Sequence, residues 1–227
     1  MDGLSLRRRI ALDIARSMRK SQEEEHPLRQ LFWECTLRCN LRCQHCGSDC
    51  KQVAATPDMP KEDFFKVLDS IAAKTDPHKV FVIISGGEPT MRADLEECGK
   101  GIYSRGFPWG MVTNGFGMTA ERFSRLLGAG LHSMTVSLDG LEENHDWLRG
   151  REGSFTRAAE TIRMAVRSGI AFDVVTCVNR RNYSQLPQLK EFLIGLGLKE
   201  WRLFSIFPQG RAALNPDLQL PPEMFRG

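Results

Sequence analysis

The chain has 227 residues, a length typical of one domain with an appendage or of two small domains. Its 31 basic and 28 acidic side chains leave a formal charge of only +3, so a nucleic acid is not expected as the main partner. With 41% apolar and 26% charged residues, the composition is that of a folded protein and argues against a disordered or fibrous chain.

The first segment, residues 4–20, predicts one basic amphipathic helix. Leu6, Ile10, Ile14 and Met18 recur at helical spacing, and most arginines lie on the other side. We expect this helix to pack on the main domain, and docking to a partner or to an anionic membrane is the alternative. A charged linker follows it.

No apolar run approaches the roughly 18 residues that a membrane span needs, since the longest is Val80–Ile84. The N-terminal segment is interrupted by arginines and lacks the apolar stretch of a secretion signal. We therefore expect a cytoplasmic protein without a membrane span, in which cysteines stay reduced.

From residue 29 onward, short β-branched or aromatic runs alternate with longer helical patterns, which predicts strand–helix units in a parallel α/β sheet. This alternation leaves open a doubly wound sheet and a complete or partial (β/α) barrel, both of which bind ligands at the carboxyl ends of their strands. No phosphate loop or full dinucleotide fingerprint occurs. Six strands are expected, at Gln30–Thr36, Lys79–Ser85, Trp109–Thr113, His132–Leu138, Ala171–Asn179 and Glu200–Phe207.

Five of the seven cysteines fall within a short stretch after the first predicted strand, a clustering that indicates a metal site. Only Cys39, Cys43 and Cys46 have three-then-two spacing. Three thiolates can hold three irons of a [4Fe–4S] cube and leave the fourth iron open to a substrate or cofactor. A structural zinc site, with His45 or Cys50 as fourth ligand, is the alternative.

These cysteines resemble the radical S-adenosylmethionine (radical SAM) superfamily, whose hallmark is C-x3-C-x2-C after the first strand of a partial (β/α)6 barrel. The resemblance extends over residues 29–212. It implies a partial TIM-like barrel, a [4Fe–4S] cluster on the three cysteines, and S-adenosylmethionine (SAM) chelated to the open iron. Its other motifs are Gly86-Gly87-Glu88-Pro89, Thr113-Asn114-Gly115, Ser137-Leu138-Asp139-Gly140 and Pro208-Gln209-Gly210-Arg211-Ala212.

The resemblance also implies cofactor-binding roles at the strand ends. Gly86 and Gly87 let the backbone approach SAM, and Glu88, followed by Pro89, offers an acceptor to its amino group. Two residues apart on one strand, Ser137 and Asp139 are expected to reach the ribose or carboxylate. Further polar candidates for the cofactor are Asn114, Arg149 and Asn179.

The remaining cysteines and His45 receive weaker assignments. Cys98 and Cys177 sit in apolar patterns and are expected to pack as small buried residues. Cys35 and Cys50 bracket the motif, and we expect them to pack there; contact with the cluster, protection of it, or ligation of a second centre are the alternatives. The resemblance places an aromatic residue where His45 stands and a tyrosine where Gly47 stands, so His45 either stacks near the adenine or faces solvent.

By resemblance, the chain reductively cleaves SAM to a 5′-deoxyadenosyl radical that takes hydrogen from a substrate, with an external one-electron donor. We expect a peptide or protein side chain as substrate; a small metabolite, or a non-catalytic iron–sulfur or zinc scaffold, remains open. The expected domains are residues 1–28 (helix and linker), 29–212 (radical SAM core) and 213–227. The last resembles the start of a SPASM- or twitch-type extension that is truncated here.

Overall fold

The computed structural model describes residues 5–225, apart from the side chains of residues 22, 24, 25 and 225. Six parallel strands form one sheet in the order of the chain. A doubly wound sheet would reverse its strand order, so this order confirms the predicted partial α/β barrel. The strands are β1 (Gln30–Thr36), β2 (Phe81–Gly86), β3 (Trp109–Thr113), β4 (Leu131–Ser137), β5 (Ala171–Val178) and β6 (Trp201–Ser205).

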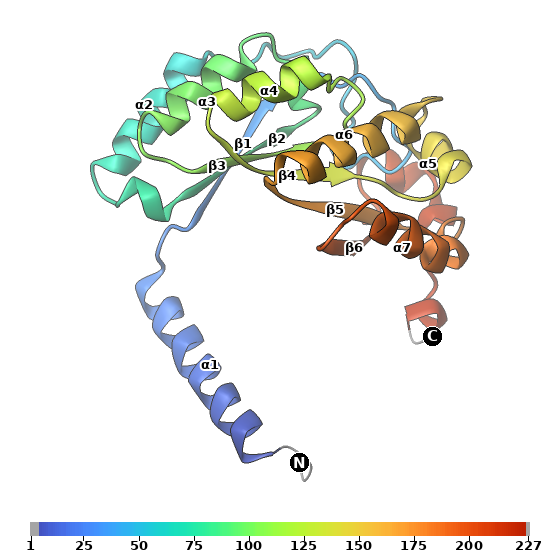
Figure 1. Ribbon diagram of the computed structural model, residues 1–227, viewed down its shortest axis with the longest axis horizontal. Helices are drawn as coiled ribbons and strands as arrows, with labels where there is room; N and C mark the ends of the chain where they lie inside the picture. Colours follow the sequence, from blue (N-terminus) through green and yellow to red (C-terminus); the bar gives the residue numbers. More distant parts are fainter. Residues whose placement is uncertain (1–4, 226–227) are drawn as a thin grey trace.

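Helices cover the outer face of the sheet, from α2, α3 and α4 over the first strands to α7 beside β5 and β6 (Figure 1). They are α2 (Lys61–Ala72), α3 (Leu95–Tyr103), α4 (Ala120–Gly128), α5 (Glu142–Arg149), α6 (Ser154–Ser168) and α7 (Leu186–Gly195). Short 3-10 turns lie at Pro77–Lys79, Pro89–Met91, Tyr183–Gln185, Gly210–Leu214, Pro216–Leu218 and Pro222–Phe225.

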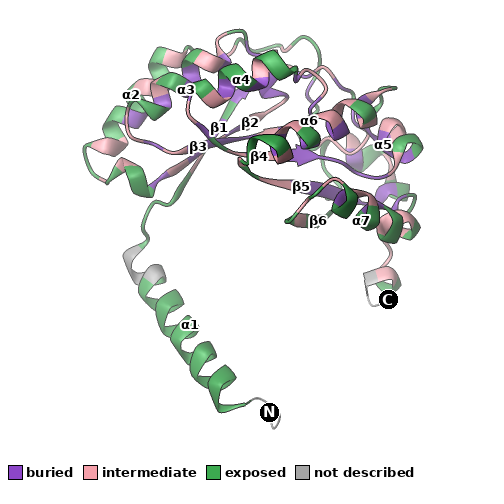
Figure 2. Cartoon of the chain, viewed as in Figure 1, coloured by how far each residue is buried: buried purple, intermediate pink, exposed green. Residues whose placement is uncertain are grey.

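The core lies between the sheet and these helices, because each strand alternates its side chains between two faces. On β1, Trp33 is 5% exposed and stacks on Phe64 of α2 with ring centroids 3.9 Å apart, whereas its neighbour Phe32 is 62% exposed. Buried residues such as Leu68, Trp109 and Ile162 extend this core along the sheet (Figure 2). The opposite face is the concave inner side of the partial barrel, and it carries exposed residues such as Phe32 beside half-buried ones such as Thr135.

Helix α1 (Leu6–Glu25) extends away from the barrel, and its side chains are exposed wherever the structure describes them (Figures 1 and 2). The expectation that it packs on the main domain is wrong: Ile14 and Met18 of its apolar stripe are 55% and 58% exposed. The helix also takes in residues expected in the linker. None of the helices among residues 5–225 is long and apolar enough to cross a membrane.

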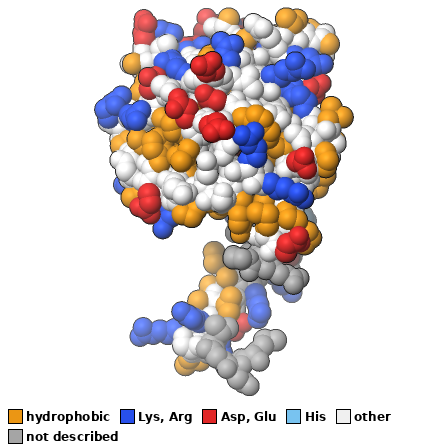
Figure 3. Space-filling model, turned by 90° about the vertical axis from the view of Figure 1, so that its right-hand side faces the viewer, with side chains coloured by type: hydrophobic (Ala, Val, Ile, Leu, Met, Phe, Trp, Pro, Cys, Tyr) orange, Lys and Arg blue, Asp and Glu red, His pale blue; other side chains and the backbone are white. Residues whose placement is uncertain are grey.

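The segment after β6 folds back onto the barrel. Leu218 is 1% exposed and packs with Leu148 of α5, Ile206 and Ala212. In the space-filling view, this end of the barrel shows apolar, basic and acidic side chains intermingled, with α1 standing clear of it (Figure 3). The segment therefore covers the side of α5 next to the cysteine loop.

Candidate metal centre

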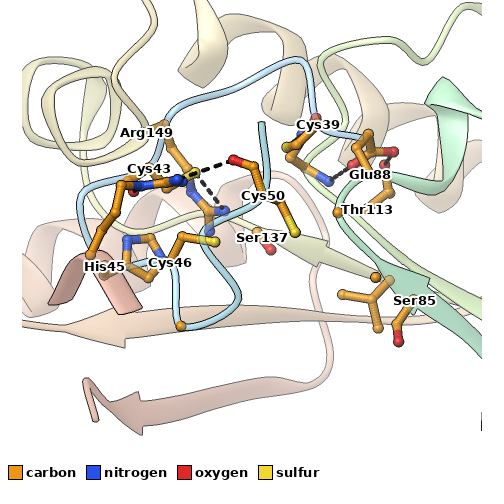
Figure 4. A pocket seen from close by; sticks show the side chains of 16 residues that line it. Cys39, Cys43, His45, Cys46, Cys50, Ser85, Glu88, Thr113, Ser137 and Arg149 are labelled. Atoms are coloured by element: carbon orange, nitrogen blue, oxygen red, sulfur yellow. Dashed lines mark hydrogen bonds between the residues drawn. The ribbon is translucent and has the colours of Figure 1, made fainter. Parts of the chain in front are cut away.

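A cavity of about 260 Å³ opens at the carboxyl ends of the first four strands (Figure 4). It is here that the parallel barrel was expected to bind ligands. The loop between β1 and α2 forms one wall, and the ends of β2, β3 and β4 form another. The lining residues that matter most for chemistry are Cys39, Cys43, Cys46, Cys50, Ser137 and Arg149.

The cysteine loop, residues 37–52, is closed at its base by backbone pairing. Arg38 and Lys51 form a parallel bridge, and the Cys39 N–H donates to the Lys51 carbonyl at 2.8 Å. The ends of the loop also pair with the segment after β2, since the Glu88 N–H donates to the Arg38 carbonyl at 2.9 Å. The loop therefore has a fixed position before any metal binds.

Gly86 and Gly87, which also line the cavity, make this pairing possible. A Cβ atom on Gly87 would lie 2.2 Å from the Arg38 carbonyl oxygen, and one on Gly86 2.3 Å from that of Thr36. Gly86 also has a φ of +118°, which residues with side chains rarely adopt. These glycines bring the backbone close to the cysteine loop.

Arg211, in the turn after β6, holds the loop from the other side. Its Nε donates to the Cys43 carbonyl at 2.7 Å, and its Nη1 donates to the Cys50 carbonyl at 3.0 Å and to Asp49 at 2.6 Å. Its backbone N–H donates to the Cys46 carbonyl at 2.9 Å. The sequence shows the motif that contains Arg211 but does not reveal these hydrogen bonds, because their partners lie more than 160 residues away in the chain.

The Glu88 carboxylate is 1% exposed and already accepts four hydrogen bonds. Its oxygens accept from the Thr90 N–H and hydroxyl, the Thr113 hydroxyl and the Asn114 N–H, at 2.8–3.1 Å. It therefore ties the ends of β2 and β3 together. Pro89 is buried and begins the 3-10 turn beside it.

Asn114 and Arg149 each direct a donor at a cysteine of the motif. The Asn114 Nδ2 lies 3.9 Å from the Cys39 sulfur and also donates to Asn40 at 2.9 Å. The Arg149 Nη1 lies 3.8 Å from the Cys43 sulfur. Hydrogen bonds to cluster sulfurs are one of the means by which proteins set the potential of an iron–sulfur centre.

Ser137 and Asp139 do not face the same space, contrary to the expectation that both reach the cofactor. Ser137 lines the cavity, whereas Asp139 is 0% exposed and lies behind it. Asp139 accepts from the Arg149 Nε at 2.6 Å and from the Cys177 N–H at 2.8 Å. Strand β4 ends at Ser137, so strand alternation no longer applies two residues later.

The ion pair between Asp139 and Arg149 explains the protonation of both groups. Burial alone would raise the pKa of Asp139, but the Arg149 guanidinium and weaker contributions, including the hydrogen bond from the Cys177 N–H, together hold that pKa below its usual value. Burial opposes the charge on Arg149 as well, and the Asp139 carboxylate overcomes it and raises the pKa of Arg149. A charged Arg149 therefore stands at the cavity wall.

Burial disfavours the charged thiolate form of three cysteines of the cavity. Burial raises the pKa of Cys39 to about 12 and that of Cys50 to about 11, and it also raises the pKa of Cys43. Metal ligation requires thiolates, so loading this centre releases protons. The imidazole of His45 also lines the cavity, and burial lowers its pKa to about 4.

Comparison with known proteins connects this geometry with a family. Residues 33–193 match the sequence model of the Radical SAM superfamily. The chain belongs to the Radical SAM superfamily. Membership implies a [4Fe–4S] cluster and SAM as cofactors, in agreement with the three-cysteine spacing.

Several proteins of known sequence resemble this radical SAM chain. It is 29% identical over 201 residues to an AdoMet-dependent heme synthase of Oleidesulfovibrio alaskensis, covering 88% of this chain and 51% of that protein. It is 26% identical to a PqqA peptide cyclase of Rhizobium meliloti, covering 86% and 52%. The chain thus spans about half the length of the curated relatives it matches.

Solved structures share the radical SAM fold. The anSMEcpe protein with bound AdoMet superposes with a TM-score of 0.74 at 17% identity, covering 88% of this chain and 57% of that chain. Streptococcus suis SuiB bound to S-adenosylmethionine superposes with a TM-score of 0.68 at 15% identity, covering 97% and 50%. These likenesses establish the partial barrel.

The residues of this radical SAM chain fit the cluster that the family implies. Three thiols with the motif spacing line one cavity, and two of them have hydrogen-bond donors directed at their sulfurs. The His45 Nδ1 is buried without a hydrogen-bond partner among residues 5–225, so it is available to a bound group. His45 therefore does not face solvent.

The other candidates lie outside the cavity. Cys98 is 0% exposed in the core of the radical SAM barrel, as expected. Cys177 is only partly buried, and its sulfur lies within 4.8 Å of ligand atoms of His45 and Asp139. Asn179 is 2% exposed, and its Oδ1 accepts from the Arg181 N–H at 2.9 Å, so it shapes the loop after β5.

Proposed function

We propose that this chain is the catalytic core of a radical SAM enzyme, with a [4Fe–4S] cluster bound by Cys39, Cys43 and Cys46. The observation that carries this proposal is the meeting of these three thiols in one cavity at the carboxyl ends of the barrel strands. When bound, the cluster supplies the electron that cleaves SAM into methionine and a 5′-deoxyadenosyl radical, which takes a hydrogen atom from the substrate.

The chain's own residues bind and orient SAM. The charged Arg149 and the hydroxyl of Ser137 line the cavity and supply donors for carboxylate and hydroxyl groups. Asp139 positions Arg149, and Glu88 positions Asn114 beside Cys39. The backbone at Gly86 and Gly87 lines the wall, and the Glu88 Oε2, which accepts from the Asn114 N–H, keeps acceptor capacity for the amino group of SAM.

We propose a peptide or protein side chain as the substrate, bound on the concave face of the sheet, and an external one-electron donor. Phe32 on β1 and Phe204 on β6 are 62% and 48% exposed, and the Arg202 guanidinium lies over the Phe204 ring and donates to the Thr135 hydroxyl. Related structures include SuiB bound to the precursor peptide SuiA and anSMEcpe with a bound peptide. An extended peptide can bind along such a concave face.

A carboxylated porphyrin is the second candidate substrate. An Fe-coproporphyrin III synthase of Methanosarcina barkeri is 30% identical to this chain over 192 residues. Arg202 favours this candidate too: its Nε pairs with Asp173 and its Nη2 donates to Thr135, while its side chain is 51% exposed and its Nη1 makes no hydrogen bond among the described residues. A guanidinium held in this way can bind a propionate.

Anaerobic reconstitution tests the proposal. The loaded chain is expected to hold about four irons and four sulfides, and to produce methionine and 5′-deoxyadenosine from SAM on reduction. The variant Cys43→Ala should lose both properties, whereas Cys98→Ala, which removes a thiol outside the cavity, should keep them. One zinc and no sulfide per chain would refute the proposal and favour a structural zinc site.

The substrate class is tested by hydrogen transfer. A candidate peptide or porphyrin with deuterium at the reacting carbon should pass deuterium into 5′-deoxyadenosine, which mass spectrometry detects. Arg202→Gln should weaken binding of a carboxylated porphyrin and change binding of an uncharged peptide little. Deuterium transfer from neither class would refute both substrate proposals.

A further inference from the structure

The cavity contains one more thiol than the motif requires. Cys50 lines it together with the three motif cysteines and is 5% exposed. Its side chain points into the same space as that of Cys46 (Figure 4). Cysteines that only fill the core, such as Cys98, do not line the cavity.

The fold fixes Cys50 beside the motif although eleven positions separate it from Cys39. The bridge between Arg38 and Lys51 brings the two ends of the loop together, so the residues next to that bridge lie side by side. Arg211 then donates to the Cys50 carbonyl at 3.0 Å. The position of this fourth thiol is therefore set by the same contacts that position the cluster ligands.

We propose that the Cys50 thiolate binds the fourth iron of the cluster in the SAM-free protein and leaves it when SAM binds. This inference rests on the proposed cluster at Cys39, Cys43 and Cys46. Three thiolates leave one iron without a protein ligand, and a further thiolate at the same cavity is a soft ligand well suited to iron–sulfur centres. Cys50 thus protects the iron until the cofactor arrives.

The exchange is balanced without an oxidant or reductant. The iron–sulfur bond to Cys50 breaks, and the amino nitrogen and a carboxylate oxygen of SAM take its place. The proton that the ammonium group of SAM must lose to bind iron passes to the Cys50 thiolate. No electron moves, so the cluster keeps its oxidation state throughout.

The structure also provides space for the released thiol. A second cavity of about 400 Å³ lies on the outer side of the cysteine loop and shares Cys39, Cys50 and Arg211 with the first. Cys50 therefore stands in the wall between the two cavities. The proposed exchange requires only that its side chain turn from the inner toward the outer cavity.

The affinity of the reconstituted chain for SAM tests the proposal, because the proposal predicts tighter SAM binding when Cys50 is removed. Cys50→Ala removes a competing ligand, so it should bind SAM at least about tenfold more tightly than the wild type if the capped form predominates by that factor. Cys98→Ala is the matched control and should keep the wild-type Kd. Equal or weaker SAM binding by Cys50→Ala would mean that Cys50 only packs there, and would overturn the proposal.

Alkylation of the wild-type protein gives a second readout that needs no variant. With the cluster loaded and SAM absent, iodoacetamide should modify Cys50 as slowly as the motif cysteines. Added SAM should raise the rate at Cys50 by about tenfold or more and leave the other three protected, as read by peptide mass spectrometry. An unchanged or lower rate at Cys50 would refute the exchange while leaving the proposed function standing. A chain that binds no iron would refute both.

Discussion

Replacing Asp139 by alanine tests whether a buried ion pair organises this end of the barrel. The side chains of Asp139 and Arg149 are 0% and 9% exposed, and the guanidinium Nε lies 2.6 Å from the carboxylate. Removal of one partner leaves the other charge buried without compensation, which costs roughly 3–5 kcal/mol. That is a large part of the 5–15 kcal/mol that typically stabilises a domain.

Part of this loss of unfolding free energy comes from the interaction between Asp139 and Arg149, and part comes from the other contacts of each side chain. Asp139→Ala and Arg149→Ala should each lower the free energy of unfolding by about 3–5 kcal/mol, while the double variant should lose clearly less than their sum. Each single change should lower Tm by roughly 6–20 °C at about 2–4 °C per kcal/mol for a domain of this size.

Urea unfolding of the metal-free chain under reducing conditions, followed by circular dichroism, measures these free energies without interference from cluster loading. The exposed pair Arg105–Asp69, with side chains 28% and 59% exposed, is the matched control and should cost less than about 1 kcal/mol when broken. A loss below 1 kcal/mol for Asp139→Ala, or strictly additive single losses, would refute the reasoning.

Three further predictions concern other parts of the fold. Burial alone would raise the pKa of Asp94, but the hydrogen bond and the charge of the Arg92 guanidinium hold that pKa below its usual value. The ionised Asp94 carboxylate therefore stabilises the fold fully above about pH 4, and this stabilisation is lost as the pH falls through the pKa of Asp94 in the folded protein. The stabilities of the wild type and Asp94→Asn, measured by thermal unfolding, should converge near pH 2. Gly87→Ala should cost about 1–3 kcal/mol of unfolding free energy, because its Cβ would meet a carbonyl of the cysteine loop. A Cβ at Gly128 would meet nothing within 4 Å, so Gly128→Ala should cost none, and similar losses for the two variants would contradict the steric argument. Ile14→Ala on exposed α1 should change the urea midpoint little, whereas Ile162→Ala in the core should cost about 2–5 kcal/mol, and a large effect at Ile14 would show that α1 is packed.

The sequence predicts the barrel well because its strands have a regular side-chain period. The bounds of β1 and β3 agree with the expected ranges, since both are short runs rich in aromatic or apolar residues that have strand propensity. Strand β2 begins two residues later than expected, because Asp76 accepts from the His78 N–H and starts a 3-10 turn at Pro77–Lys79. Side-chain capping of this kind is not visible in hydrophobic periodicity.

The sequence is a poorer guide to contacts that depend on a partner. The apolar stripe of α1 correctly predicted a helix, but amphipathicity does not say what covers the apolar side. Likewise, the two-residue spacing of Ser137 and Asp139 predicted a shared face only as long as β4 continued. Once the strand ended, the charge of Arg149, rather than strand geometry, decided where Asp139 lies.

The cysteine loop shows why local spacing identifies ligands and yet leaves their arrangement open. Spacing alone selects Cys39, Cys43 and Cys46, because it limits which thiols a single cluster can reach. The loop itself has little regular structure, so distant segments must hold it: the turn after β2 through Gly87, the end of α5 through Gln44, and Arg211 after β6. These three contacts lie on different sides of the loop, so together they keep its thiols directed into one cavity, including the one thiol that the motif does not contain.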